Sequence, residues 1–441
     1  MRILFVEQQY AGGQHWDGVG TFTIDVTRQL ARAGHEVHVL SCVQWQQPRD
    51  ETIEGVHVHF RGELRVRGLQ RLLRQPGLSD VHSWLSVRDA ELSYFLRLSL
   101  SNYVEYRRLG IDVDVIEAST YPRSTLLFAL FQPRPLVLTA HSAGWPLLVR
   151  LLGLPDTLAA GEETANYLTP FVKVLNALTA FQGRRAAAFT VPAPLLARAY
   201  VHEPVYSSIV DRIKVVPYAV SPEPWSQTPD VRSTGRLVVQ VGRLEARKAG
   251  EVLVDAAARL VTEFPDLEVV LIGDSYGTRD GLPYDQWLRE RATERGAPCR
   301  VVAGVAREEV ISWYGRARVV ALPSWFDSFP FAGLEALAAG RPLVCSNGVG
   351  YAELVAAAGA GAVVGVGDDA ALAQQLGRYL EDPEAAAQAG SAARALTTEG
   401  KLSVGESLDR RVAVYQEAIA SFAHGAGASG PGSGSPTLGL T

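Results

Sequence analysis

Two carboxylates, Asp327 and Glu335, lie eight positions apart in the part of the sequence that holds most of its candidate chemistry. An apolar run ends just before this segment and predicts a buried strand there. Pro330 is expected to open the next helix, because proline suits a first helical position, whose N–H has no intrahelical partner. Asp327 would then precede the helix and Glu335 would lie more than one turn inside it, so both could accept hydrogen bonds from one bound sugar. A plainer interpretation makes Asp327 the helix cap and Glu335 a solvated helix residue.

The start of this helix also predicts an anion-binding site. The amides of Phe331, Ala332 and Gly333 would point out of the helix end, where the helix dipole favours negative charge. Gly333 would let a phosphate approach the backbone closely.

Two cations follow the first apolar run in the second half of the chain, in the segment Gly242-Arg-Leu-Glu-Ala-Arg-Lys248. Arg243 would be held at the end of a strand and Lys248 at the start of the next helix. Two fixed cations at such positions could neutralise a diphosphate as negative charge builds on a leaving group. Ordinary surface basicity is the alternative interpretation, although lysine is rare in this chain. The lysines are Lys173, Lys214, Lys248 and Lys401.

The elements that must position these groups alternate between short apolar runs and helix-like stretches, which is the pattern of parallel sheets covered by helices. We expect strands at 2–6, 36–41, 56–60, 113–117 and 136–140, and again at 237–241, 267–272, 300–303, 319–322 and 342–345. Helices are expected at 21–33, 249–264, 307–316, 331–339 and 403–422, the first between a glycine-rich loop at 11–20 and a cap at Gly34. The fold class is therefore α/β, with two Rossmann-like doubly wound domains facing across a cleft. Ligands are expected at the carboxyl ends of the strands.

The composition of the chain suggests where the domains begin and end. We place an N-terminal domain at 1–220 and a C-terminal domain at 230–400, because prolines in 216–224 and polar residues in 226–234 are typical of a linker. The helix at about 403–422 could pack back on the first domain. The Gly/Ser/Pro-rich stretch 424–441 predicts a disordered tail.

Charge and cysteine content narrow the class of protein. The 441 residues carry a formal net charge of -5, which argues against a general nucleic-acid binder. Cys42, Cys299 and Cys345 show neither disulfide nor zinc spacing, as is typical of a reducing compartment. The apolar run at the start is too short for a signal peptide, and no later stretch reaches the roughly 20 apolar residues of a membrane span. We therefore expect a soluble, cytoplasmic protein.

Taken together and in order, these motifs resemble glycosyltransferase family 4, whose members have the GT-B fold. The similarity runs from residue 1 to about 420 and is weakest in the middle of the first domain. The motifs are Gly242-Arg-Leu-x-x-x-Lys248, Gly273-Asp274, Ala303-Gly-Val305, Pro323-Ser324, Asp327-x7-Glu335 and, near the start, Gly18-Val-Gly-Thr-Phe22 with Leu30-Ala-Arg-Ala-Gly-His-Glu-Val-His-Val39.

The resemblance implies roles for matching residues of the second domain. Arg243 and Lys248 would hold the donor diphosphate, Glu335 would bind the nucleotide ribose, and Asp327 would contact hydroxyls of the donor sugar. The other implied donor-binding residues are Val305, Phe331 and Ala332, the last two through their amides.

In the first domain the resemblance implies that Gly18 and Gly20 line a loop that closes on the donor. His141, at the end of the strand expected at 136–140, would face the cleft near the sugar, unless it is bonded locally at the strand end. The implied catalytic set is Arg243, Lys248, His141 and Asp327.

The implied activity is transfer of a hexose-type sugar from a nucleotide diphosphate donor, UDP by default, to an acceptor hydroxyl with retention of configuration. The leaving phosphate would help to deprotonate the acceptor, and no metal or other cofactor is needed if two cations neutralise the diphosphate. Two departures bear on which sugar fits. Asp327 stands where the family more often has Glu, and Pro330 stands where Gly is common.

The acceptor side is expected in the arginine- and aromatic-rich region 62–110, with Trp84 and Tyr103, and at Trp145. Aromatic rings stack well on sugar or cyclitol faces, so a small specialised metabolite or a glycan is the expected acceptor. The arginines in 61–74 could form a membrane-facing patch, but a solvated face is favoured.

Other patterns are weaker. Asp112-Val-Asp114 leads into a strand rather than ending one, so we do not interpret it as a metal motif. Gly18-x-Gly-x-x-Thr23 lacks the third glycine of a dinucleotide fingerprint, which argues against NAD. His57 and His59 have no further ligands nearby in sequence, so a zinc site is not expected.

Two other functions remain open from the sequence. An epimerase or hydrolase acting on sugar nucleotides would use a carboxylate pair such as Asp327 and Glu335. A non-catalytic nucleotide-sugar-binding subunit would keep the binding residues without turnover.

Overall fold

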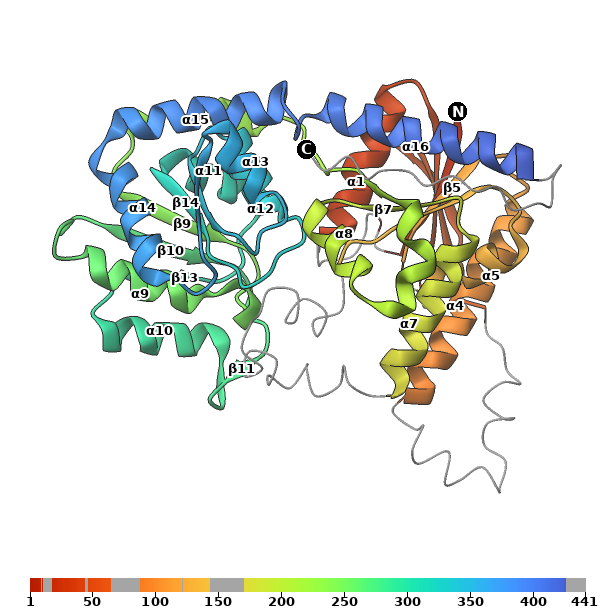
Figure 1. Ribbon diagram of the computed structural model, residues 1–441, viewed down its shortest axis with the longest axis horizontal. Helices are drawn as coiled ribbons and strands as arrows, with labels where there is room; N and C mark the ends of the chain where they lie inside the picture. The colour runs from red at the N-terminus through yellow and green to blue at the C-terminus, as the bar shows by residue number, and fades with distance from the viewer. Residues whose placement is uncertain are drawn as a thin grey trace.

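The structure is a computed structural model of the 441-residue chain. It describes residues 1–8, 10, 18–43, 47–64, 88–120, 122–142 and 170–425. Two α/β domains lie side by side, and the last helix passes from the second domain back over the first (Figure 1).

The first domain is built on an eight-stranded sheet with the order β3-β4-β2-β1-β5-β6-β7-β8. All neighbouring strands are parallel except β3 and β4. Its strands are β1 (Arg2–Val6), β2 (Glu36–Val43), β3 (Arg49–Ile53), β4 (Val56–Gly62), β5 (Val115–Ser119), β6 (Leu136–Thr139), β7 (Ala188–Val191) and β8 (Ile213–Val215).

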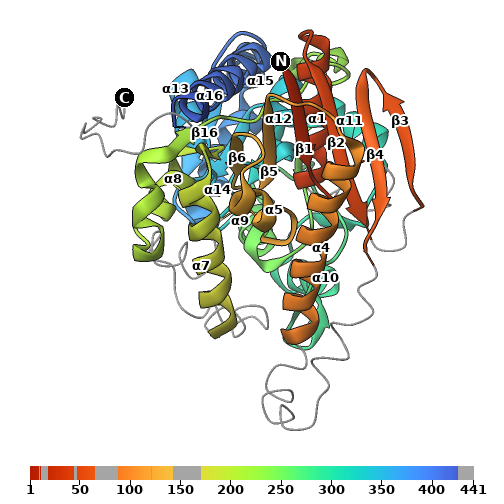
Figure 2. The same ribbon diagram turned by 90° about the vertical axis from the view of Figure 1, so that its right-hand side faces the viewer.

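Helices cover both faces of this sheet, which is why its central strands are continuous apolar runs. Its helices are α1 (Gly18–Arg32), α4 (Arg88–Leu109), α5 (Pro122–Phe131), α7 (Pro170–Arg185), α8 (Pro194–Val201) and the 3-10 helix η2 (Pro204–Arg212). Helices α4, α5 and α7 pack on one face (Figure 2), and α1 packs on the other together with the last helix of the chain, α16 (Val404–Gly425).

The second domain is built on a six-stranded, wholly parallel sheet with the order β13-β10-β9-β14-β15-β16. Its strands are β9 (Leu237–Val241), β10 (Glu268–Ile272), β13 (Cys299–Val302), β14 (Val319–Leu322), β15 (Leu343–Ser346) and β16 (Gly361–Val364), with a small hairpin of β11 (Thr278–Arg279) and β12 (Leu282–Pro283). Its helices are α9 (Gly250–Leu260), α10 (Tyr284–Arg295), α11 (Arg307–Arg316), α12 (Phe331–Ala338), α13 (Ala352–Ala358), α14 (Asp369–Glu381) and α15 (Pro383–Thr398).

The fold class predicted from the sequence is therefore confirmed, and several boundaries differ. Helix α1 begins at Gly18, so Gly18 and Gly20 form its first turn and do not lie in a loop, as expected, ahead of a helix starting at residue 21. Strand β3 was missed because its residues, Arg-Asp-Glu-Thr-Ile, are polar and lie at the exposed edge of the sheet, where no apolar run is needed. Gly34 has a positive φ of 85°, as the expected helix cap requires.

The segment between the domains is packed rather than extended. Trp225 is fully buried and its ring meets that of Tyr314, at a centroid distance of 5.9 Å. One cluster of buried apolar residues, which includes Tyr218 and Trp225, runs through both domains. The interdomain contact is thus part of the core, a feature that the polar and proline-rich composition of 216–234 did not indicate.

Helix α16 closes the molecule on the first domain. Arg411 forms a fully buried ion pair with Glu117 of β5, and Tyr415 donates to the same carboxylate. The 426–441 part of the tail lies outside the described residues. Among the described helices, none is long and apolar enough to cross a membrane.

Candidate active site

Loops that follow β9, β10, β13 and β14 meet at the carboxyl edge of the second sheet, because these strands are parallel neighbours. Gly242 and Gly273 directly follow β9 and β10, with φ of 145° and 156°. A Cβ atom at Gly273 would lie 1.9 Å from the carbonyl oxygen of Gly242, so the two loops pack backbone to backbone. Glycine at both positions therefore fixes the loop that carries the predicted cations.

Lys248 and Asp327 face one another at this edge. Lys248 is the last residue of the 3-10 turn η5 (Ala246–Lys248), and its ammonium pairs directly with the carboxylate of Asp327. Arg247 lies 3.6 Å from the other oxygen of Asp327 and donates to the carbonyl of Phe326 at 2.9 Å. The side chains of Lys248 and Asp327 are only 16% and 9% exposed, so this ion pair is largely removed from water.

The charges of this pair shift each other's pKa. Burial lowers the pKa of Lys248, and the attraction of Asp327 offsets part of that effect. Burial would raise the pKa of Asp327, but Lys248 and Arg247 outweigh it and the net shift is downward. Asp327 is therefore a carboxylate, and it is not the helix cap, because Pro330 occupies that position.

Arg243 is the open cation of the cluster. Its side chain is 53% exposed, lies 3.4 Å from Glu245 and extends over the ring of Tyr276, 5.2 Å from the centroid. Together with Arg247 and Lys248 it outnumbers the two carboxylates, Glu245 and Asp327. The expected pair of free cations is thus a partly neutralised cluster that keeps a positive excess.

Helix α12 begins at Phe331, at the start of the expected range 331–339, but Pro330 is its cap residue and not its first helical residue. The amide of Gly333 is not available to an anion, because it donates to the carbonyl of Pro330 at 3.1 Å. Among the described residues the amides of Phe331 and Ala332 have no acceptor. The anion site at this helix end is therefore made of two amides rather than the three that we expected.

Gly333 has a packing role instead of admitting a phosphate. A Cβ atom there would lie 2.0 Å from the hydroxyl of Tyr351 and 2.7 Å from Leu322. Tyr351 in turn donates to the carbonyl of Pro330 at 2.7 Å. Glycine thus lets α12 sit directly on its sheet and on Tyr351.

Glu335 lies at the interface between the domains. Its carboxyl group, 12% exposed, is 3.2 Å from Arg307 at the start of α11. Burial raises the pKa of Glu335 to about 7, Arg307 opposes this shift, and Asp25 of α1 adds to it. Burial also raises the pKa of Asp25, whose Oδ2 atom has no hydrogen-bond partner among the described residues. Glu335 is therefore not a solvated helix residue, and it faces a carboxylate of the opposite domain.

His141 follows β6 and is half-buried at the same interface. Its Nδ1 atom lies 2.7 Å from the hydroxyl of Tyr218, and its ring makes a T-shaped contact with that of Phe22 of α1, with centroids 4.9 Å apart. Ser328, in the loop before α12, donates to the carbonyl oxygen of His141 at 2.5 Å. The histidine is held by long-range contacts from both domains and not, as the alternative interpretation had it, by a local bond.

The remaining predicted residues fall in different places. Val305 lies half-buried in the loop after β13, at the same edge as the cation cluster. Gly18 and Gly20 begin α1, in the domain opposite the cation cluster. Trp84 and Trp145 lie outside the described residues.

Tyr103 does not serve the cleft. Its ring packs on Phe128 and Phe131 of α5 at 5.4 and 5.1 Å. It lies near the C-terminal end of α4, and that end leads to the amino edge of β5, opposite the carboxyl edge where ligands bind. We therefore withdraw Tyr103 as an acceptor residue.

Histidines gather elsewhere in the first domain. His38 Nδ1 lies 3.0 Å from His59 Nε2, His59 contacts Asp50 at 2.8 Å, and the ring of His57 stacks on that of His38. The register of β2 and β4 places them together, which spacing along the chain could not reveal. Among the described residues no group of three His, Cys, Asp or Glu side chains is arranged to hold a metal ion.

Four residues at the site escaped the sequence argument. Arg247 was passed over as an unassigned position between Arg243 and Lys248, although its position in the motif could have identified it. The other three, Asp25, Tyr218 and Arg307, come from separate segments and meet the predicted residues only through the packing of the two domains.

Solved structures share this arrangement of two domains. Sucrose-phosphate synthase from Thermosynechococcus elongatus superposes with a TM-score of 0.64 at 18% identity, covering 96% of this chain and 97% of that one. An α,α-trehalose-phosphate synthase from Burkholderia xenovorans in complex with glucose-6-phosphate gives 0.64 at 14% identity, covering 94% and 100%. An Anabaena protein in complex with UDP and glucose gives 0.62 at 16% identity, covering 96% and 99%. The fold is therefore GT-B, with the cation cluster and α12 facing the first domain.

Family models identify the chain more closely. The model described as Glycosyltransferase Family 4 matches residues 16–224, and the one described as Glycosyl transferases group 1 matches residues 223–396. The chain belongs to glycosyltransferase family 4.

Two curated relatives show how far the sequence similarity extends. A D-inositol 3-phosphate glycosyltransferase from Corynebacterium urealyticum is 36% identical over 155 residues, which are 34% of this chain and 36% of that enzyme. The chain thus matches about a third of that relative's length. Glycogen synthase from Mycobacterium tuberculosis is 27% identical over 416 residues, which are 89% of both chains.

Proposed function

We propose that this protein is a retaining, metal-independent glycosyltransferase that moves a hexose-type sugar from a nucleotide diphosphate donor to a hydroxyl group of an acceptor. The observation that carries the proposal is the cation cluster beside the amides of Phe331 and Ala332, which have no acceptor in the part of the chain that the structure describes. Glu335 lies one turn further along the same helix. Cations and helix amides together bind phosphate. A carboxylate one turn further along the helix could accept hydrogen bonds from the hydroxyl groups of a ribose.

We assign the role of each residue in donor binding from the exposure of its side chain and from the contacts that it already makes. Arg243, exposed and held by its loop, would bind the outer face of the diphosphate, and the amides of Phe331 and Ala332 would bind phosphate or sugar oxygens. Lys248 would contribute the N–H groups that Asp327 leaves unused, because an ammonium has three donors. Asp327 would contact a hydroxyl group of the donor sugar. Its larger effect would be to hold Lys248 in position through their ion pair.

The chemistry needs little more than charge and position. As the bond from the anomeric carbon to the phosphate oxygen breaks, negative charge moves to the diphosphate, where Arg243 and Lys248 stabilise it. The leaving phosphate would accept the proton of the acceptor hydroxyl, which attacks from the same face of the sugar. His141, held at the interface, would contact the donor sugar from the first domain.

UDP is the nucleotide that we propose. The support for it is an Anabaena protein of the same fold, whose structure is solved with UDP and glucose. For the acceptor we propose a small hydroxylated metabolite or a glycan, since relatives include a D-inositol 3-phosphate glycosyltransferase and a glycogen synthase. We also propose that the protein acts in the cytoplasm.

The test measures thermal shift and nucleotide release with UDP-, GDP-, ADP- and dTDP-sugars, with EDTA present throughout. A donor at a hundredfold excess over its Kd should stabilise the protein by about 2.7 kcal/mol. Arg243→Ala and Lys248→Ala should lose that stabilisation. Lys214→Ala is the control, because Lys214 lies in β8 of the first domain and its ion pair with Glu417 is exposed.

The outcomes separate the competing functions. Stabilisation by a donor with acceptor-dependent nucleotide release supports a transferase, and proton NMR of the product's anomeric signal tests retention. Release of the nucleotide without an acceptor would indicate a hydrolase. A changed sugar on an intact nucleotide would indicate an epimerase, and binding without turnover would indicate a non-catalytic subunit. No stabilisation by any donor would remove the proposal.

A further inference from the structure

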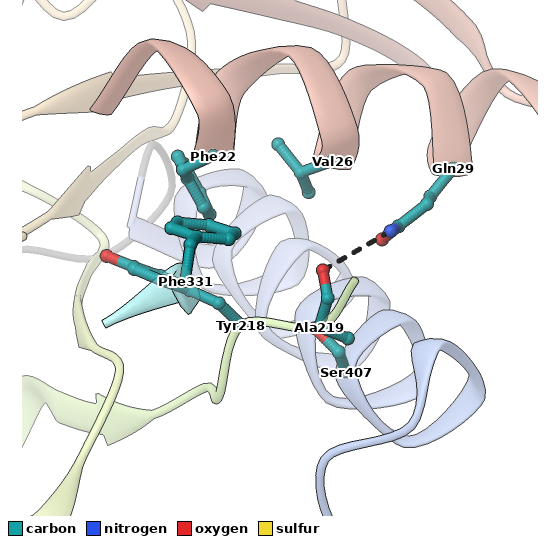
Figure 3. Close-up of a pocket in the computed structure, with 7 residues that line it drawn as sticks. All are labelled: Phe22, Val26, Gln29, Tyr218, Ala219, Phe331 and Ser407. Atoms are coloured by element: carbon teal, nitrogen blue, oxygen red, sulfur yellow. Dashed lines mark hydrogen bonds between the residues drawn. The ribbon is translucent and has the colours of Figure 1, made fainter. Parts of the chain in front are cut away.

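Tyr218 stands where the two domains meet and makes one polar contact of interest, with His141. Its hydroxyl lies 2.7 Å from His141 Nδ1. Its ring is 5% exposed and belongs to the segment that leaves the first domain after β8. In Figure 3 the hydroxyl points away from the small cavity beside Val26 and Gln29.

The direction of this hydrogen bond follows from the protonation states of the two groups and from the other acceptors within reach of the Tyr218 hydroxyl. If His141 donated from Nδ1, the buried phenol would need another acceptor for its own proton, and none is recorded among the described residues. Burial raises the pKa of Tyr218, so it keeps that proton, and burial lowers the pKa of His141 to about 3, so the imidazole is neutral. Tyr218 therefore donates to Nδ1, and the remaining proton of His141 lies on Nε2.

Aromatic contacts hold the donor in place. The centroid of the Tyr218 ring lies 4.4 Å from that of Phe22 of α1 and 5.8 Å from that of Phe331 of α12, to which it is nearly parallel (Figure 3). The ring of Phe329 makes a T-shaped contact with it at 5.2 Å. These contacts come from both domains, so the phenol cannot rotate away while the domains are together.

The charged groups around the pair do not supply a competing partner. Arg411 of α16 lies near enough to His141 to oppose its protonation. That arginine is itself paired with Glu117, which also accepts from Tyr415. For His141 Nε2 the described residues offer no partner.

We infer that Tyr218 is a positioning residue that fixes His141 as the Nε2–H tautomer and presents that N–H as a hydrogen-bond donor to an oxygen of the bound ligand. The contact between His141 and the ligand rests on the proposed function, whereas the assignment of the tautomer does not. A fixed donor needs no reorganisation when the ligand binds, which is how a preorganised group contributes to rate. The sequence motifs assign no role to Tyr218.

The direct test is long-range proton–nitrogen NMR of the histidine-labelled full chain, with the His141 signals assigned by comparison with His141→Gln. The wild type should show one tautomer with the proton on Nε2. Tyr218→Phe keeps the ring contacts and removes the donor, so it should give a mixture of the two tautomers. Tyr206→Phe is the matched control, since it removes another buried tyrosine's bond, to Asn176, and should leave His141 unchanged. A wild-type Nδ1–H signal, or no change in Tyr218→Phe, would overturn the inference.

Kinetics give a second readout. Tyr218→Phe should lower kcat about tenfold, the worth of one hydrogen bond, with a smaller change in KM. In a His141→Gln background it should have no further effect, because Tyr218 acts through His141. If the effects of the two substitutions on kcat multiply in the double variant, Tyr218 acts independently of His141. That result would indicate a structural role and contradict the inference. If no donor turns over, the proposed function fails, and the NMR experiment still decides the tautomer.

Discussion

Ionisable residues at the site are held in pairs, and each pair limits what its members can do. If Lys248 moved away from Asp327, it would leave a buried carboxylate without this partner. The charge of Arg307 acts on two carboxyl groups, those of Glu335 and of Asp25 in the other domain. Glu335 stands out because burial raises its pKa to about 7, so the neutral and charged forms are comparably populated near that pH. A carboxyl group in such a place lowers the stability of the unliganded protein when it is charged, and such costs are typical of functional sites.

Replacing Glu335 by Gln should stabilise the unliganded protein at high pH. Its folded pKa of about 7 lies above the ordinary value of 4.5. The folded state therefore holds this proton more tightly, so the contribution of Glu335 to stability is full below about pH 4.5 and is lost as pH rises through 7. The shift corresponds to roughly 3 kcal/mol, so Glu335→Gln should exceed the wild type by up to that amount at pH 8 and match it near pH 4.5.

Urea unfolding of both proteins across this range measures the effect. Glu353→Gln is the control, since Glu353 is 78% exposed and its replacement should change stability little at any pH. A difference between Glu335→Gln and the wild type that does not vary with pH would show that the carboxyl is not perturbed as described. Nucleotide affinity should fall in the same variant if Glu335 binds the ribose.

Helix α12 is the element on which the site depends, and its position is set by close packing. The amides of Phe331 and Ala332 at its start, the loop with Asp327 before it and Glu335 within it all depend on the position of this helix. Its third residue, Gly333, touches Tyr351 and the end of β14. Because protein interiors are close-packed, there is no space into which an added methyl group could fit without moving the helix.

Gly333→Ala should therefore destabilise the protein by about 1–3 kcal/mol and weaken nucleotide binding by displacing the helix start. Gly405→Ala in α16 is the matched control, because a Cβ there meets nothing within 4 Å. That substitution should be neutral or stabilise by up to about 1 kcal/mol through helix propensity. Chemical denaturation and nucleotide titration measure both variants, and equal effects at the two glycines would disprove the packing role.

The whole molecule is closed by α16, which leaves the second domain and locks onto the first. Its buried Arg411 pairs with Glu117, and Ser407 donates to the carbonyl of Pro217 at 2.6 Å in the segment that carries Tyr218. The core is continuous through both domains, so domain arrangement and stability are linked.

Arg411→Met should cost about 3–5 kcal/mol, because it leaves the carboxylate of Glu117 buried without its cation. Arg410→Met is the control one residue away, since Arg410 makes an exposed pair with Glu406 worth at most about 0.5 kcal/mol. Adding Glu117→Gln to Arg411→Met should restore part of the loss. Urea unfolding gives these values, and an Arg411→Met variant as stable as Arg410→Met would contradict the role of the buried pair.

The sequence by itself determined the fold class and the strands and helices around the second-domain motifs. Leu237–Val241 and Val319–Leu322 are apolar because a parallel sheet is buried on both faces, so composition alone locates them. Short-range motifs also pointed to Arg243, Lys248, Asp327 and Glu335, since all four lie in or just after the connections that follow β9 and β14.

Only the tertiary structure decided how these residues are paired. The partners of Glu335 and His141 are Arg307, Asp25 and Tyr218, which come from three other segments, two of them in or next to the first domain. Such pairs depend on the packing of one domain against the other, which no local pattern records. The polar edge strand β3, the buried Trp225 and the packing role of Gly333 follow the same rule, because burial and close contact are properties of the folded chain.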